Sequence, residues 1–354
     1  MPRPEIDADT PILVTGATGY VAGWIVKRLL EAGATVHAPI RDAGNSAKTR
    51  HLDAIAEDAP GTIRYFEADL LEEGSYAEAM AGCGVVFHTA SPFTSDYDDP
   101  QKDLIDPALN GTRNVLSEAS KTETVRRVVV TSSCAAIYSD NTECQDAPGG
   151  RLTEDVWNET ASLDYQPYNY SKTVAEREAW RIANNQDQWR LVTINPSLVV
   201  GPAIGGTPSS ESFSIVARIG NGEFKQGAPR LGIGVVDVRD VAEAHIAAGF
   251  LPDAQGRHIT SGHDTDLFSV SQELVPSYGE SYPIPTRAAP KWLVWLIAPK
   301  AGLERGYVKR NVDVPFRADN SKSREKLGLE YRPLGLSMMQ MFDYMIRHDY
   351  FPRA

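Results

Sequence analysis

Short apolar runs alternate with amphipathic stretches through the first half of the chain. The runs are continuous in hydrophobicity, which is typical of strands that helices cover on both faces. Between them, Val21, Ile25 and Leu29 share one helical face, and helices are also expected at 104–120 and 167–184. The alternation predicts an α/β fold with a doubly wound parallel sheet. Its strands are expected at 12–15, 35–40, 62–66, 85–88, 128–131 and 191–195.

The pattern changes after residue 195. The segments 200–208 and 220–234 are rich in glycine and proline and predict loops, whereas 237–249 is helical in pattern and 257–260 predicts a further strand. Residues 263–354 contain short helices interrupted by prolines. We therefore expect a sheet domain of residues 1–195 plus 236–262. Residues 196–235 plus 263–354 would form a smaller, discontinuous C-terminal cap that binds substrate.

Composition excludes several classes of protein. The chain has 354 residues and a net charge of −12, which argues against binding to duplex nucleic acid. No apolar stretch approaches the ~20 residues that a membrane span needs, and residues 1–5 lack the apolar core of a signal peptide. The three cysteines, Cys83, Cys134 and Cys144, are expected to be reduced thiols of a cytoplasmic protein. No Cys/His cluster has metal-ligand spacing, so no metal is expected.

A glycine-rich turn follows the first predicted strand. Gly16 permits the tight turn, Gly19 allows close approach of a pyrophosphate to the start of the next helix, and Ala22 is small enough for helix–strand packing. Such a turn is weak evidence by itself, but its position between a first strand and a helix favours a dinucleotide site.

The end of the second strand indicates which dinucleotide would bind. An NAD-selective site usually has an acidic residue there, yet this chain has Ile40 followed by Arg41, with Lys48 further on. A guanidinium can pair with a 2′-phosphate, which predicts NADP(H). The alternative is that Arg41 pairs with Asp42 on the surface. Asp69 and the adjacent Leu70 could hold the adenine edge, although Asp69 could equally cap a helix.

Tyr168 and Lys172 stand four residues apart on a predicted helix and therefore share one face. A nearby ammonium would lower the phenol pKa from about 10 and make Tyr168 a better acid–base group. Chance alone predicts roughly 0.4 such pairs in this chain, so the pair by itself is weak evidence. Its position adds weight, because it follows a strand that ends at Ser132-Ser133. Ser133 would lie where open α/β sheets bind ligands and could donate a hydrogen bond to a substrate carbonyl.

Taken in order, these motifs resemble the extended short-chain dehydrogenase/reductase superfamily, within the NAD-dependent epimerase/dehydratase fold family. The nearest resemblance is to the dihydroflavonol reductase, cinnamoyl-CoA reductase and aldehyde/ketone reductase group, and it covers about residues 11–350. It rests on the sequences at 14–22, 40–42, 68–70, 86–92, 110–112, 130–133, 168–172, 195–202 and 236–241.

This resemblance implies a Rossmann fold and a cytoplasmic enzyme that reduces an aldehyde or ketone with NADPH, reversibly. It implies that Ser133, Tyr168 and Lys172 are catalytic and that Arg41 and Lys48 bind the 2′-phosphate. A small-molecule carbonyl or alcohol would be the partner of a monomer or homodimer. The other residues expected to bind the cofactor are Gly16, Thr18, Gly19, Tyr20, Val21, Asp69, Leu70, Thr89, Ala90, Ser91, Pro196, Ser197, Leu198 and Val199.

Two departures from the group concern the substrate. Tyr138 stands five residues after Ser133, where dihydroflavonol reductases often have Asn, and residues 166–170 lack the Asn-Trp-Tyr-Cys-Tyr motif of cinnamoyl-CoA reductases. The first departure argues against a flavonoid substrate, and the second argues against a coenzyme A ester. Phe93, Tyr138, Tyr170 and the 220–234 loop are candidate pocket walls.

Other interpretations stay open. A nucleotide-sugar epimerase or dehydratase with bound NAD would share the fold and the Ser, Tyr and Lys residues, and a non-catalytic NADP-sensing regulator would share the fold alone. The apolar segment 291–298 is followed by basic residues and fits a cap helix with its tryptophans against the pocket better than a membrane-surface helix. His88 and His245 are expected to be structural.

Overall fold

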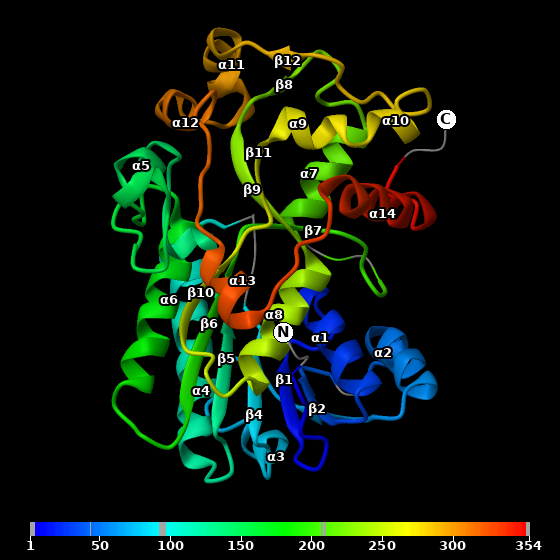
Figure 1. Ribbon diagram of the computed structural model, residues 1–354, viewed down its shortest axis with the longest axis vertical. Coiled ribbons are helices and arrows are strands. Elements are labelled where there is room, and N and C mark those ends of the chain that lie inside the picture. Colours follow the sequence, from blue (N-terminus) through cyan, green and yellow to red (C-terminus); the bar gives the residue numbers. More distant parts are fainter. Residues whose placement is uncertain (1–3, 43, 92–96, 207, 209, 352–354) are drawn as a thin grey trace.

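The computed structural model describes residues 4–42, 44–91, 97–206, 208 and 210–351. A seven-stranded parallel sheet in the order β10-β6-β5-β4-β1-β2-β3 forms the lower half of the molecule in Figure 1. Each predicted strand agrees with its observed counterpart to within one residue at either end. The strands are β1 (Ile12–Thr15), β2 (Thr35–Ile40), β3 (Thr62–Glu67), β4 (Val85–His88), β5 (Arg127–Thr131), β6 (Arg190–Pro196) and β10 (Gly256–Thr260).

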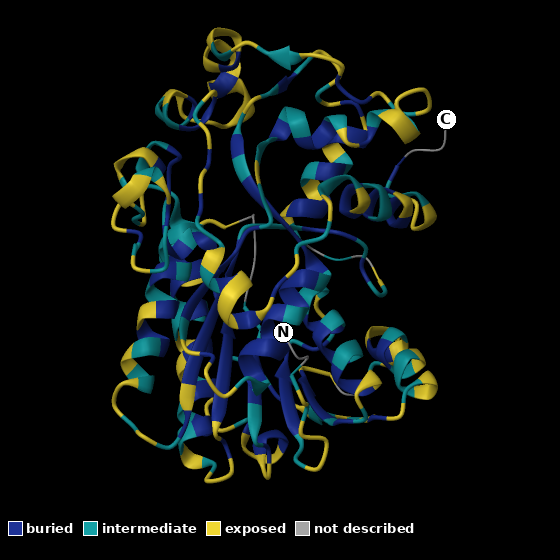
Figure 2. Cartoon of the chain, viewed as in Figure 1, coloured by how far each residue is buried: buried dark blue, intermediate teal, exposed yellow. Residues whose placement is uncertain are grey.

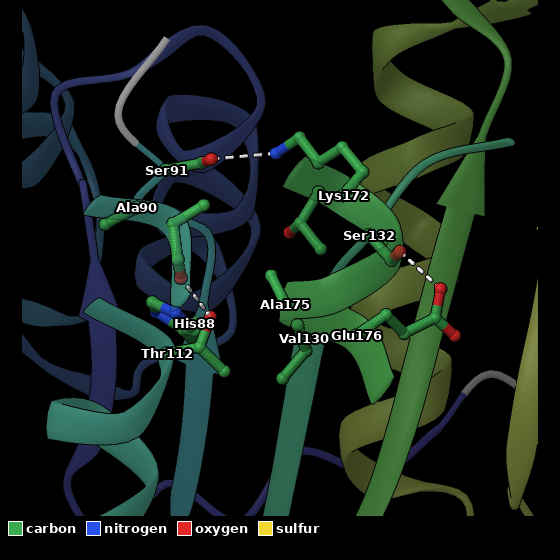
Figure 3. Close-up of a pocket in the computed structure, with 11 residues that line it drawn as sticks. His88, Ala90, Ser91, Thr112, Val130, Ser132, Lys172, Ala175 and Glu176 are labelled. Atoms are coloured by element: carbon green, nitrogen blue, oxygen red, sulfur yellow. Dashed lines mark hydrogen bonds between the residues drawn. The ribbon is translucent and has the colours of Figure 1, made fainter. Parts of the chain in front are cut away.

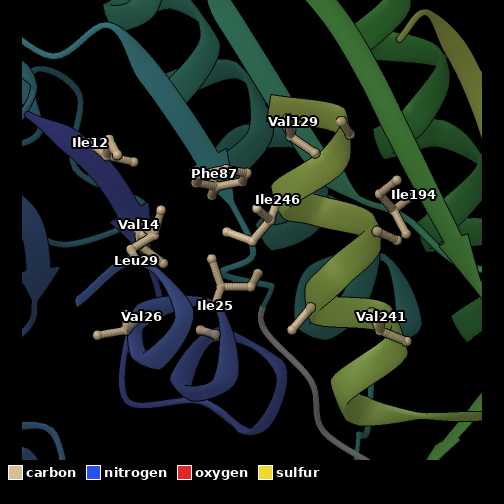
Figure 4. Close-up of a cluster of buried hydrophobic side chains, with 14 of the residues drawn as sticks. Ile12, Val14, Ile25, Val26, Leu29, Phe87, Val129, Ile194, Val241 and Ile246 are labelled. Carbon is tan, nitrogen blue, oxygen red and sulfur yellow. The ribbon is translucent and has the colours of Figure 1, made fainter. Parts of the chain in front are cut away.

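Helices cover both faces of this sheet, which confirms the doubly wound fold. Alternate residues of β1 enter opposite cores: Ile12 and Val14 pack toward α1 and α8, whereas Leu13 packs toward α4 and α6. Figure 4 shows the first of these cores, where side chains of the sheet meet those of α1 and α8. One face carries α1 (Tyr20–Glu31), α2 (Ser46–Asp58) and α8 (Val238–Phe250), and the other carries α3 (Ala77–Met80), α4 (Asp106–Lys121) and α6 (Pro167–Ala183).

Two helix boundaries differ from the predictions. The helix expected from residue 104 is preceded by a π-helical segment, Gln101–Ile105, which runs directly into α4. The helix expected from residue 237 begins at Val238, because the Asp237 carboxylate accepts a hydrogen bond from the backbone N–H of Arg239 at 2.8 Å and acts as the N-cap.

The cap occupies the upper half of Figure 1 and has a small sheet of its own in the order β11-β9-β7. The prediction of a loop over 220–234 was wrong, because this segment contains β8 and the start of β9. Gly234 lies there for close packing: a Cβ on it would come 2.4 Å from the Phe316 ring. The strands are β7 (Leu198–Val200), β8 (Ala228–Pro229), β9 (Gly232–Asp237), β11 (His263–Asp266) and β12 (Ala288–Ala289).

The cap helices pack around their own apolar core, which includes Phe213, Met341 and Phe342. One of them, α13, instead packs on β10 and α8, and its Leu327 joins the core of the large sheet. The cap and sheet domains are therefore interlocked. The helices outside the sheet layers are α5 (Thr142–Asp146), α7 (Glu211–Gly220), α9 (Leu267–Gln272), α10 (Val275–Tyr278), α11 (Lys291–Ile297), α12 (Arg305–Asn311), α13 (Ser321–Leu327) and α14 (Leu334–Arg347).

Candidate active site

The glycine-rich turn lies at the carboxyl end of β1. Gly16 has a φ of +64°, and a Cβ there would come 3.0 Å from Cα of Ala90. Gly19 is the N-cap of α1 and offers no side chain to its free backbone N–H groups. The turn is therefore narrow, and the start of α1 stays open to an anionic group, as a dinucleotide pyrophosphate requires.

Side chains next to this turn connect β1, β4 and the cap. The Thr15 hydroxyl accepts hydrogen bonds from the backbone N–H groups of Thr89 and Ala90, at 3.1 and 3.0 Å. In the first turn of α1, the Tyr20 hydroxyl donates to the backbone oxygen of Gly201 at 2.6 Å. The turn is thus anchored from both the sheet and the cap. Of its remaining predicted residues, Thr18 is half-buried and Val21 packs against the sheet core.

The predicted 2′-phosphate ligands lie at the end of β2. Ile40 is the last residue of that strand and is nearly buried, whereas Arg41 and Lys48 are exposed. Among the ion pairs of the described residues, none joins Arg41 to Asp42, so the surface-pair alternative is not what this structure contains. Arg41 lies close enough to Tyr76 to lower the pKa of that phenol, although burial raises it more strongly, to about 12.

Asp69 and Leu70 follow β3 and have different surroundings. The Asp69 carboxylate accepts a hydrogen bond from the Leu71 N–H at 2.8 Å within a turn, and the next helix, α3, begins only at residue 77. Asp69 is therefore not a helix cap. Leu70 packs against α4 so closely that a Cβ on Gly111 would lie 2.6 Å from Leu70 Cγ.

The three predicted catalytic residues come together at the carboxyl edge of the large sheet. Ser133 follows β5, while Tyr168 and Lys172 lie one turn apart at the start of α6. The Ser133 hydroxyl lies near enough to the Tyr168 phenol to lower the pKa of that phenol. Lys172 Nζ lies 5.7 Å from the centroid of the Tyr168 ring and donates to Ser91 Oγ at 2.8 Å.

Burial controls the acid–base behaviour of this group. Burial raises the pKa of Tyr168 to about 12, which outweighs the lowering by the Ser133 hydrogen bond. Burial lowers the pKa of Lys172 to about 8. The expectation that Lys172 would depress the phenol pKa is therefore wrong, because loss of hydration dominates and the Lys172 ammonium donates to Ser91.

A pocket opens beneath Lys172 between the ends of β4 and β5 and the helices α4 and α6. Figure 3 shows the Lys172 side chain reaching across the pocket to Ser91, which lies on the opposite side from Ser132 and Glu176. His88 also lines the pocket; its Nδ1 lies 3.0 Å from the Thr15 hydroxyl, and burial lowers its pKa to about 3. His245 is likewise buried and hydrogen-bonded to Thr131 at 2.7 Å, so both histidines are structural, as expected.

Sequence reasoning missed a buried polar cluster behind the catalytic residues. Glu176 is only 1% exposed, and its carboxylate accepts hydrogen bonds from Ser132 Oγ at 2.5 Å, Asn195 Nδ2 at 2.7 Å and Arg257 Nε at 2.7 Å. Asn195 Nδ2 also donates to the backbone oxygen of Ser133 at 3.3 Å. The Glu176 cluster therefore fixes the turn that carries Ser133. Two signals were available: an acid one turn after Lys172, and an arginine within a predicted strand.

The remaining predicted residues that the structure describes lie after β5, at or after the end of β6, or in α6. Pro196 ends β6, the Ser197 N–H donates to the backbone oxygen of Thr260 at 3.1 Å, and Leu198 and Val199 begin β7. Tyr138 packs against Phe316, with ring centroids 5.2 Å apart. Tyr170 is half-buried in the first turn of α6, and Phe93 lies outside the described residues.

Residues 12–260 match the family model described as the NAD dependent epimerase/dehydratase family. The chain belongs to this family. A cinnamoyl-CoA reductase (CAD2) of Medicago truncatula is 36% identical over 338 residues, which is 93% of each chain. A dihydroflavonol 4-reductase of Gerbera hybrida is 32% identical over 283 residues, covering 80% of this chain and 76% of its own. The solved structure of Gre2 from Candida albicans in complex with NADPH is 27% identical, with a TM-score of 0.74 over 96% of this chain and 99% of that one.

These findings confirm the resemblance to extended short-chain dehydrogenases/reductases and the predicted fold. The relatives are oxidoreductases that act on small molecules, as their names state. None of the helices among the described residues is long and apolar enough to cross a bilayer.

Proposed function

We propose that this family member is an NADPH-dependent reductase that converts an aldehyde or ketone into an alcohol, reversibly. The observation that carries the proposal is the grouping of Ser133, Tyr168 and Lys172 at the carboxyl edge of the sheet, with Lys172 Nζ 5.7 Å from the centroid of the Tyr168 ring. Similarity to two plant reductases over at least three quarters of the chain supports it.

The residues of the site suit this chemistry. Bound NADPH would supply the hydride, held with its pyrophosphate on the turn from Gly16 to Gly19. Ser133 would donate a hydrogen bond to the substrate oxygen, where negative charge develops. Tyr168 keeps its proton at neutral pH because its pKa is about 12, and it would transfer that proton to the same oxygen. Lys172, oriented by Ser91, would bind the ribose hydroxyls next to the nicotinamide.

The preference for NADPH over NADH is a separate proposal. It is supported by Arg41 and Lys48, which are exposed at the end of β2, and by the absence of an acid at Ile40. A charged, bidentate donor at Arg41 can pair with a 2′-phosphate that NADH lacks. The Gre2 structure from Candida albicans contains NADPH and is consistent with this preference.

The catalytic assignment is tested by Tyr168→Phe, which removes the phenolic proton and keeps the ring. With NADPH and a panel of aryl aldehydes, aryl ketones, diketones and flavanones, turnover should fall by about 10²–10⁴-fold. Binding of NADPH, followed by its fluorescence, should persist. Tyr282→Phe is the matched control, because that ring packs on Phe342 in the cap core. Unchanged turnover in Tyr168→Phe would refute the assignment.

The family also includes epimerases and dehydratases, so the nucleotide-sugar alternative needs its own test. Such an enzyme keeps NAD tightly bound, and purified protein that carries NAD through gel filtration would favour it. The aldehyde or ketone substrate, the monomeric or homodimeric state and a cytoplasmic location remain predictions. Three free, buried cysteines support a reducing compartment.

A further inference from the structure

Exposed apolar side chains are concentrated in one short segment of the cap. Of the ten large hydrophobic side chains that are exposed among the described residues, six lie between residues 292 and 303. We call these six the α11 patch; they are Trp292, Leu293, Trp295, Leu296, Ile297 and Leu303. Figure 2 shows much of α11 and the turn after it as exposed, at the top of the molecule. The exposure of Trp292 and Trp295 contradicts the expectation that these two side chains pack against the pocket.

The geometry of α11 explains the exposure. Val294 and Ala298 are one turn apart and face inward, where they form a small separate cluster with Val308 and Val312. Trp292 and Leu296 are also one turn apart, on the outward face, and are 67% and 55% exposed. A helix that is apolar on both faces needs a second apolar or amphipathic neighbour beyond the protein's own core.

The charge around the α11 patch is opposite to that of the whole protein. Residues 291–310 contain five basic residues and one acidic residue, on a chain whose net charge is −12. Lys300, Arg305 and Lys309 are exposed, and the Arg305 guanidinium lies 4.3 Å from the centroid of the Trp295 ring. The patch is thus an apolar surface with a cationic rim.

We propose that the α11 patch docks this protein onto an anionic lipid bilayer. Exposed Trp and Leu side chains enter the headgroup boundary favourably, and lysine and arginine at the rim attract anionic headgroups. Seven helical residues are far too few to span a bilayer. The patch therefore supports reversible attachment to the surface of one leaflet.

The same charges argue against a second copy of the chain as the occupant. A two-fold contact through the patch would bring the cationic rims of two molecules together, because such an interface is self-complementary in position. The two positively charged rims would then face each other and repel. A bilayer with anionic lipid satisfies both the apolar face and the rim.

The test is flotation of the full-length protein with two kinds of vesicle, pure phosphatidylcholine and phosphatidylcholine with about 30% phosphatidylserine. The protein should float with the anionic vesicles, and flotation should weaken at high salt. Trp292→Ala with Leu296→Ala should lower the partition coefficient at least about tenfold. Lys300→Gln with Lys309→Gln should weaken binding to anionic vesicles only.

Matched controls separate the patch from general effects. Leu71→Ala removes an equally exposed leucine, at 54%, from the segment that follows β3 in the sheet domain. Lys102→Gln with Lys121→Gln removes two exposed charges elsewhere. These controls should float like the parent protein, and all variants should retain turnover of a water-soluble carbonyl substrate.

Three results would overturn the proposal: no flotation of the parent protein with anionic vesicles, flotation that survives Trp292→Ala with Leu296→Ala, or a dimer that these two substitutions convert to monomer without any vesicle binding. The vesicle assay does not depend on catalysis, so failure of the reductase assignment would be recognised separately.

Discussion

Replacing Arg257 with Met isolates what the Glu176 cluster contributes. Arg257 and Glu176 are 7% and 1% exposed at the side chain and form an ion pair at 2.7 Å. The arginine also donates to the backbone oxygen of Glu154 at 2.9 Å and stacks on the Trp157 ring at 3.8 Å. Met fills much of the same volume but leaves the Glu176 carboxylate without its counter-charge in a region that excludes water.

The loss of stability in Arg257→Met can be estimated from the burial of the Arg257–Glu176 ion pair. Removing one partner of a buried ion pair destabilises a protein by about 3–5 kcal/mol. With an unfolding entropy of about 2.1 cal/mol/K per residue, a 354-residue chain loses about 1 °C in Tm for each ~0.7 kcal/mol. Arg257→Met should therefore lower Tm by about 4–7 °C. Adding Glu176→Gln removes the unpaired charge and should restore at least about half of that loss.

The assay is thermal unfolding followed by near-ultraviolet circular dichroism, with all variants heated at one scan rate. Arg181→Met is the control, because Arg181 is 62% exposed and pairs with Glu178, which also keeps Arg113 as a partner. Its Tm should hardly change. The reasoning fails if Arg257→Met leaves Tm within about 1 °C of the parent, or if the double variant unfolds at a lower temperature than Arg257→Met.

Three further predictions concern the site and its packing. The kcat/KM for NADPH should fall as pH rises through about 8, because burial lowers the Lys172 pKa and the ammonium loses its proton there. Lys172→Arg should move that decline to higher pH. A pH profile of Lys172→Arg identical to that of the parent protein would contradict the role of Lys172 in cofactor binding. Arg41→Ala should raise the KM for NADPH at least about tenfold and leave NADH kinetics nearly unchanged, in steady-state assays with both cofactors. Gly111→Ala should destabilise the protein by about 1–3 kcal/mol in urea unfolding, because its Cβ would lie 2.6 Å from Leu70, whereas Gly23→Ala, whose Cβ meets nothing within 3.9 Å, should not.

The large sheet was predictable because its strands are buried on both faces. Continuous apolar runs such as Val128 to Val130 have few alternatives to a covered parallel strand, and their order with the intervening helices fixed the topology. The positions of Ser133 and Tyr168 were predictable for a related reason. Ser133 and Tyr168 each lie just beyond or at the start of an element that directs it to the carboxyl edge of the sheet.

The features that sequence reasoning missed depend on contacts between distant segments. The Glu176 cluster joins residues from β5, α6, β6 and β10, and no local pattern connects Ser132 with Arg257. The loop prediction for 220–234 failed because glycine there serves close packing against Phe316, which comes from far along the chain. Trp292 is exposed because the opposite face of the seven-residue helix α11 packs on the cap. The sequence of a helix that is apolar on both faces does not indicate which face will be buried.

The pKa directions at the active site favour an acid over a base. Burial stabilises the neutral forms of both Tyr168 and Lys172, since each loses hydration of its charged form. A phenol with a pKa of about 12 is fully protonated at neutral pH and ready to protonate an alkoxide, whose own basicity is higher still. The reverse oxidation of an alcohol would need the phenolate, so we expect it to require a higher pH than the reduction. Lys172, which donates to Ser91, is still largely protonated below its pKa of about 8, so both side chains would carry their protons near neutral pH, as the proposed reduction requires.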